Sequence, residues 1–71
     1  MEPVKDLLYK ALVSKYESEI AHCVATLTIY FTNSVGIGEH PQQLDEMDAL
    51  LERMSSAEDK LESLNRHFSK R

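Results

Sequence analysis

Residues 47–68 read MDALLERMSSAEDKLESLNRHF, and apolar side chains recur in this stretch at alternating spacings of three and four. Such spacing is typical of the a and d positions of a helix that packs lengthwise against other helices. The positions of this seam are Met47, Leu50, Met54, Ala57, Leu61, Leu64 and Phe68. The second half of the chain is therefore predicted to form one long helix over about residues 41–67.

A glycine-marked break comes before this helix. Gly36 suits the left-handed residue that closes a helix, and Gly38 permits a second change of direction. Pro41 suits the first position of a helix, with His40 as the cap before it. Residues 34–40 are therefore predicted to form a turn.

The first segment carries apolar residues that are mostly four apart, which predicts a helix over about residues 3–33. This stripe consists of Val4, Leu8, Leu12, Tyr16, Ile20, Val24, Leu27 and Phe31. Steps of four drift around a helix, and Leu7, Val13, Cys23 and Tyr30 widen the stripe. A wide stripe suits contact with more than one neighbour.

Residues 23–32 leave a second interpretation open, because they are rich in β-branched and aromatic types and alternate like a strand. Helix is favoured over strand for two reasons. No turn signal separates these residues from the helical pattern upstream, and a single strand has nothing to pair with.

Two long helices joined by a short connection are expected to be antiparallel neighbours. The prediction is thus an all-α protein, with residues 1–71 forming a single helical-hairpin domain.

So short a chain buries little core, and its one cysteine, Cys23, cannot form an internal disulfide. Leu44 and Leu51 lie beside the seam and add to the apolar surface that one hairpin leaves uncovered. Two copies are therefore expected to form a four-helix bundle with twofold symmetry, as a homodimer or a higher oligomer.

The residues predicted to form the oligomer or partner interface are apolar or aromatic and come from both helices. They are Tyr16, Ile20, Leu27, Phe31, Met47, Leu50, Leu51, Met54, Leu61, Leu64 and Phe68.

The net charge is −4, and the acidic residues are concentrated early in the second helix while basic residues follow late. One interpretation is that each sign matches its end of the helix dipole. The other is an acidic recognition face that meets a basic partner or mimics a nucleic acid. Its residues are Asp45, Asp48, Glu52 and Asp59.

Catalytic and metal-binding constellations are not found in the sequence. His22 and Cys23 are adjacent, so they diverge on a helix and cannot share a metal. Cys23 is interpreted as a small core residue. Tyr9, Tyr16 and Tyr30 lie on one side of the first helix, where they are expected to line the bundle with hydroxyls reaching its edge. We therefore expect no enzymatic activity, no cofactor and no metal.

The chain contains no apolar stretch long enough to span a membrane, and its first residues lack the form of a signal peptide. The free cysteine and the lack of an export signal favour a cytoplasmic location. The acidic balance argues against nucleic acid as a partner.

At residues 30–64 the sequence resembles small accessory proteins of large tailed bacteriophages. The features that carry this resemblance are Tyr30 to Asn33, the stretch VGIGEHP at residues 35–41, and AEDKLE at residues 57–62. The resemblance implies a helical protein that acts inside the infected cell, and it transfers no activity and no functional residue.

The sequence therefore favours a non-enzymatic interaction protein that binds and modulates a host or phage protein through a helical-bundle surface. One alternative is an acidic mimic of nucleic acid that inhibits a DNA- or RNA-binding enzyme. A second alternative is a helical oligomer that sequesters a small ligand between its subunits.

Overall fold

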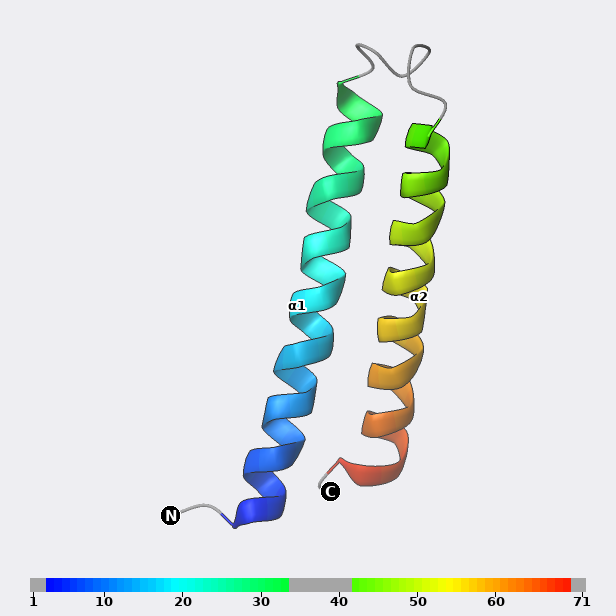
Figure 1. Ribbon diagram of the computed structural model, residues 1–71. Helices are drawn as coiled ribbons and strands as arrows, with labels where there is room; N and C mark the ends of the chain where they lie inside the picture. The colour runs from blue at the N-terminus through cyan, green and yellow to red at the C-terminus, as the bar shows by residue number, and fades with distance from the viewer. Residues whose placement is uncertain (1–2, 34–41, 70–71) are drawn as a thin grey trace.

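The computed structural model describes residues 3–33 and 42–69, which form two α-helices (Figure 1). Helix α1 spans Val4–Thr32 and helix α2 spans Gln42–Phe68. The helices run antiparallel and side by side, so the predicted all-α hairpin is confirmed. The predicted turn over residues 34–40 and the cap at His40 lie outside the described residues.

Two ends of the hairpin are distinguished below. The turn end carries the last residue of α1, Thr32, and the first residue of α2, Gln42. The open end carries Val4 and Phe68, and the two helices diverge toward it (Figure 1).

Helix α1 begins directly after Pro3, whose carbonyl accepts the N–H groups of Asp6 at 3.0 Å and Leu7 at 3.2 Å. Proline has no N–H to satisfy at a helix start, and Asp6 places a negative charge in the first turn. At the other end, the N–H of Asn33 donates to the carbonyl of Ile29 at 2.9 Å and completes the last turn.

The strand interpretation of residues 23–32 is wrong, because all of them belong to α1. The hydroxyls of Thr28 and Thr32 each donate to the carbonyl one turn earlier, at 2.7 Å. These bonds satisfy the threonine hydroxyls within the helix. Cys23 and Leu27 in the same stretch are buried against α2, and this packing outweighs the weak helix propensity of β-branched residues.

The core lies between the helices and is centred toward the turn end. Cys23 and Leu27 of α1 form a buried cluster with Met47 and Leu50 of α2, and Tyr30 packs against it. The cluster is small, so burial within one hairpin stabilises the fold only modestly.

The face that α1 turns toward α2 differs from the predicted stripe. Its buried and half-buried apolar or aromatic residues alternate in steps of three and four, and they are Tyr9, Val13, Tyr16, Ile20, Cys23, Leu27 and Tyr30. Five residues of the predicted stripe are exposed instead: Val4, Leu8, Leu12, Val24 and Phe31. Steps of four drift by about 40° each and leave a straight contact line, whereas alternating steps of three and four stay on it.

The hairpin exposes more surface than a compact chain of its size. Its accessible area is 5622 Å² for a mass of 8.1 kDa, whereas a compact monomer of that mass exposes about 4,500 Å². Leu7 and Ile29 lie exposed on the side of α1 opposite the contact face. Helix α1 is therefore apolar on all sides, which is the pattern of a helix with more than one neighbour.

Candidate interaction surface

The three tyrosines of α1 lie along its contact with α2, and their polar ends reach the edge of that contact. The Tyr9 hydroxyl donates to Asn65, and the Tyr30 hydroxyl donates to the Glu46 carboxylate at 3.1 Å. The Lys60 ammonium lies over the Tyr16 ring, 5.9 Å from its centre. The three tyrosines therefore line the contact between the two helices, and the hydroxyls of Tyr9 and Tyr30 reach its edge; their predicted place in a bundle stays a prediction.

One flank of the hairpin, which we call the polar flank, is closed by bonds between side chains of the two helices. Glu46, Arg53 and Lys60 are seven residues apart, so they form one row along α2. Each contacts a residue of α1: Tyr30 bonds to Glu46, Glu19 pairs with Arg53, and Tyr16 lies under Lys60. These contacts cover the apolar core on this side.

The Tyr30 phenol has its pKa raised above the ordinary value of 10.0. The main cause is the hydrogen bond that it donates to the Glu46 carboxylate, and the negative charge of Glu46 adds to the effect. Both favour the neutral phenol, because ionisation removes the donated proton and places two negative charges side by side.

The opposite flank carries an apolar strip at the turn end. The strip consists of Val24 and Phe31 of α1 and Leu44 and Leu51 of α2. The members of each pair are seven residues apart and form one row on their helix. With about 100° between successive residues, both rows fall on the side of the contact away from Glu19 and Arg53. Phe31 is 69% exposed and Leu44 is 67% exposed, so the strip faces solvent in the hairpin.

The apolar strip stops near the middle of the hairpin. Toward the open end, the α1 row continues as Glu17 and Lys10, and the α2 row continues as Glu58 and Asn65. All four of these polar side chains are exposed. The surface available for apolar contact on this flank is therefore confined to the turn end.

The predicted interface residues divide into two groups. Those buried or half-buried in the contact between α1 and α2 are Tyr16, Ile20, Leu27, Met47, Leu50, Met54, Leu61 and Leu64. Phe31, Leu51 and Phe68 are exposed and remain on the surface. Sequence reasoning did not include Val24 and Leu44 in the interface, although each is seven residues from a predicted member.

The acidic residues Asp45, Asp48, Glu52 and Asp59 all lie exposed on the side of α2 that faces away from α1. None of them is in a salt bridge within the described part of the chain. Asp45 is in the first turn of α2, and Arg66 and His67 are in the last turn. The charges therefore match the helix dipole, and the four carboxylates at the same time lie on one face of α2.

Cys23 is fully buried, as predicted, and lies in the apolar cluster. Among residues 3–33 and 42–69, no group of three or more histidine, cysteine, aspartate or glutamate side chains is arranged to hold a metal ion. Neither α1 nor α2 combines the length and apolarity that a membrane-spanning helix needs.

Comparison with known proteins found no matching family model, no matching curated protein and no matching solved structure.

Proposed function

We propose that this protein is a non-enzymatic helical interaction protein, and that it pairs with a second copy through the apolar strip. The observation that carries the proposal is the exposure of Val24, Phe31, Leu44 and Leu51 as two parallel rows on one flank. A twofold axis beside this flank brings the strip of one copy against the strip of the other. The result is a four-helix bundle at the turn end.

The surface area of the hairpin supports self-association. Its accessible area exceeds that of a compact monomer by about 1,100 Å², and a stable interface buries about 800 Å² on each partner. The excess is therefore large enough to supply one such interface. Contiguous exposed apolar residues on a small protein are also a common mark of an interaction site.

The assembled bundle acts by binding another protein. The resemblance of residues 30–64 to small phage proteins supports an accessory role in the cytoplasm of an infected cell, where the target is a host or a phage protein. Modulating that target requires a recognition surface only, and the chain carries exposed polar faces outside the strip that can provide one.

The first test is the mass in solution, measured by light scattering over a dilution series. The wild-type chain is expected to be a dimer, and the double variant Phe31→Ser with Leu51→Ser is expected to be a monomer. A matched control replaces Leu7 and Ile29 by serine, because these residues are equally apolar and exposed but lie outside the strip. A wild-type monomer, or equal loss of mass in both double variants, contradicts the proposed pairing.

A second candidate function is inhibition of a nucleic-acid-binding enzyme by the acidic face. It is favoured by the alignment of Asp45, Asp48, Glu52 and Asp59 along the outer side of α2 without salt-bridge partners in the described part of the chain. A row of carboxylates attracts a basic groove, and its binding weakens as salt screens the charges.

The acidic face is tested by replacing these four residues with asparagine or glutamine and measuring binding to an identified partner at two salt concentrations. Nucleic-acid mimicry predicts a large loss of affinity and a smaller salt dependence. Unchanged binding by the neutralised variant excludes this candidate and leaves the self-association proposal untouched.

A further inference from the structure

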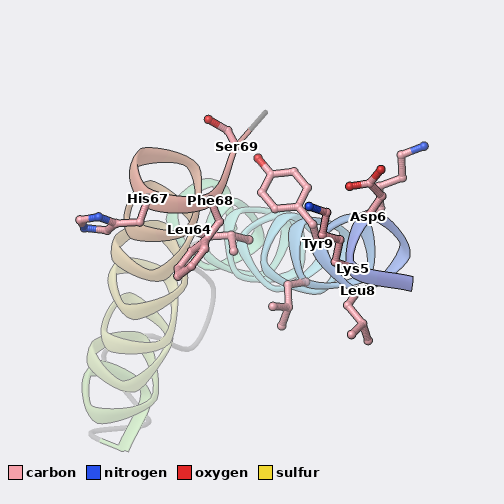
Figure 2. Close-up of a pocket in the computed structure, with 10 residues that line it drawn as sticks. Lys5, Asp6, Leu8, Tyr9, Leu64, His67, Phe68 and Ser69 are labelled. Carbon is pink, nitrogen blue, oxygen red and sulfur yellow. The ribbon is translucent and has the colours of Figure 1, made fainter. Parts of the chain in front are cut away.

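A second apolar surface lies at the open end, where the helices diverge. We call it the open-end groove. Its apolar lining comes from Leu8 and Leu12 of α1 and from Leu64 and Phe68 of α2, and it encloses about 690 Å³. Figure 2 shows Leu64 and Phe68 pointing from α2 toward α1, while His67 points away. Polar and charged residues, among them Lys5, Asp6 and Lys10, complete the lining.

Phe68 shows that the groove is an unfilled part of the helix contact. It is seven residues after Leu61 and fourteen after Met54, so it belongs to the row of α2 that faces α1. It is nevertheless 71% exposed, and Leu8 across the groove is 61% exposed. Phe68 is therefore at a position that packs between helices elsewhere in α2, but it has no neighbour on α1, because the two helices diverge at this end.

The charge around the groove is opposite to that at the turn end. Over residues 4–12 and 60–69, Lys5, Lys10, Lys60 and Arg66 outnumber Asp6 and Glu62. In the first three turns of α2, at the turn end, the charged residues are instead Asp45, Glu46, Asp48 and Glu52. The apolar lining of the groove thus lies in the basic region of an acidic protein. The positive charges around it favour a negatively charged ligand.

We propose that the open-end groove binds an acidic amphipathic α-helix of a partner protein. The splayed part of α1, Lys5 to Leu12, covers eight residues, or about 12 Å of helix. That length accepts roughly two turns of a third helix whose apolar residues recur at i, i+3 or i+4, and i+7. The apolar anchors fill the space between Leu12 and Phe68, and the acidic side chains of the ligand face Lys5.

This inference rests on the proposed function and names the kind of partner that the bundle recognises. The apolar strip is on the opposite flank and at the opposite end, so pairing of two copies leaves the groove accessible. Each copy in the dimer then carries one groove.

The test uses three synthetic peptides and fluorescence anisotropy with the full chain. The first peptide has leucine at i, i+3, i+4 and i+7 with glutamate elsewhere, the second replaces glutamate by lysine, and the third scrambles the first. Only the first is expected to bind. Phe68→Ala removes an aromatic anchor of the groove and Lys5→Glu reverses one of its charges, so each is expected to weaken binding by about tenfold.

Matched controls distinguish binding in the groove from nonspecific binding of the peptide. Phe31→Ala removes an equally exposed phenylalanine at the other end, and Lys15→Glu reverses a lysine of α1 outside the groove. Both are expected to bind like the wild type, and circular dichroism checks that every variant is folded. Equal binding of the scrambled peptide, or equal loss in Phe31→Ala and Phe68→Ala, overturns the inference.

The two proposals fail in different ways. If the wild type is a monomer but binds the acidic peptide through Phe68, self-association fails and the groove assignment stands. If the dimer forms and the peptide does not bind, the groove assignment alone fails. If Phe68→Ala abolishes the dimer while substitutions in the apolar strip do not, a second copy occupies the groove, and the partner-helix inference is wrong.

Discussion

Cys23 holds the most buried position of the described hairpin, with no exposed surface at all. It lies among Leu27, Met47 and Leu50, so its thiol acts as a small apolar group between the helices.

Replacing Cys23 by serine is expected to lower the free energy of unfolding by about 1–3 kcal/mol, since a hydroxyl is then buried among apolar side chains. Urea unfolding at fixed protein concentration measures the change. Ala21→Ser is the control, because Ala21 is exposed on the same helix, and it is expected to change stability by less than about 0.5 kcal/mol. Equal stability of Cys23→Ser and the wild type contradicts the packing role.

The Tyr30–Glu46 hydrogen bond makes stability depend on alkaline pH. Because the pKa of Tyr30 is raised by Glu46 in the folded state, the contribution is complete below the ordinary pKa of 10.0. It is lost as the pH rises through the raised pKa. Unfolding measured at increasing alkaline pH is expected to show this loss in the wild type and not in Tyr30→Phe.

The same bond can be followed directly by tyrosinate absorbance in a chain that keeps Tyr30 and has phenylalanine at positions 9 and 16. Glu46→Gln removes the negative charge, so Tyr30 is expected to ionise at lower pH than with Glu46 present. An identical titration midpoint in both chains contradicts the role of Glu46.

At the scale of the helices, α2 was easier to predict than α1. The predicted seam of α2 was correct from Met47 to Leu64, because apolar residues there are separated by charged ones and mark a single face.

Helix α1 was harder to predict, because nearly every side of it carries an apolar residue and several stripes fit the pattern. The true contact line runs through Tyr9, Cys23 and Tyr30, which are not the most apolar choices. The hydroxyls of Tyr9 and Tyr30 bond to α2 at the edge of the contact, and Cys23 is fully buried within it. Phe68 could not be placed from spacing, because the divergence of the helices at the open end is a property of their packing.

Ala57 marks a close approach of the two helices, since it is only 3% exposed and has no side chain beyond Cβ. Ala57→Leu is therefore expected to overpack the contact and destabilise the hairpin by about 1–3 kcal/mol. Ala49→Leu is the control, because Ala49 is exposed on the same helix. Chemical denaturation of both variants tests the prediction, and an Ala57→Leu variant as stable as the wild type shows that the helices are not in close contact there.

At the scale of the whole molecule, the hairpin is long and thin. Its extents are 53 × 21 × 16 Å and its radius of gyration is 16.2 Å, whereas a compact chain of this length has a radius of gyration of about 11 Å.

Two antiparallel helices could be predicted from the sequence, because the glycine-marked break and the two periodic segments leave few other arrangements. The apolar strip could not be delimited in advance, since it depends on which face α1 turns toward α2. If two copies pair as proposed, the stability of so elongated a hairpin is expected to depend on their association.

Thermal unfolding is therefore expected to depend on protein concentration. A tenfold increase in concentration changes the free energy of a dimer by about 1.4 kcal/mol, which raises the midpoint of the paired hairpins by roughly 5 °C. The Phe31→Ser, Leu51→Ser variant is expected to melt lower and with no such dependence, because a monomer gains nothing from concentration. The Leu7→Ser, Ile29→Ser control keeps the dependence. A midpoint that is constant for the wild type over a hundredfold dilution range means that one hairpin folds unaided, and that the apolar strip is free for a different protein.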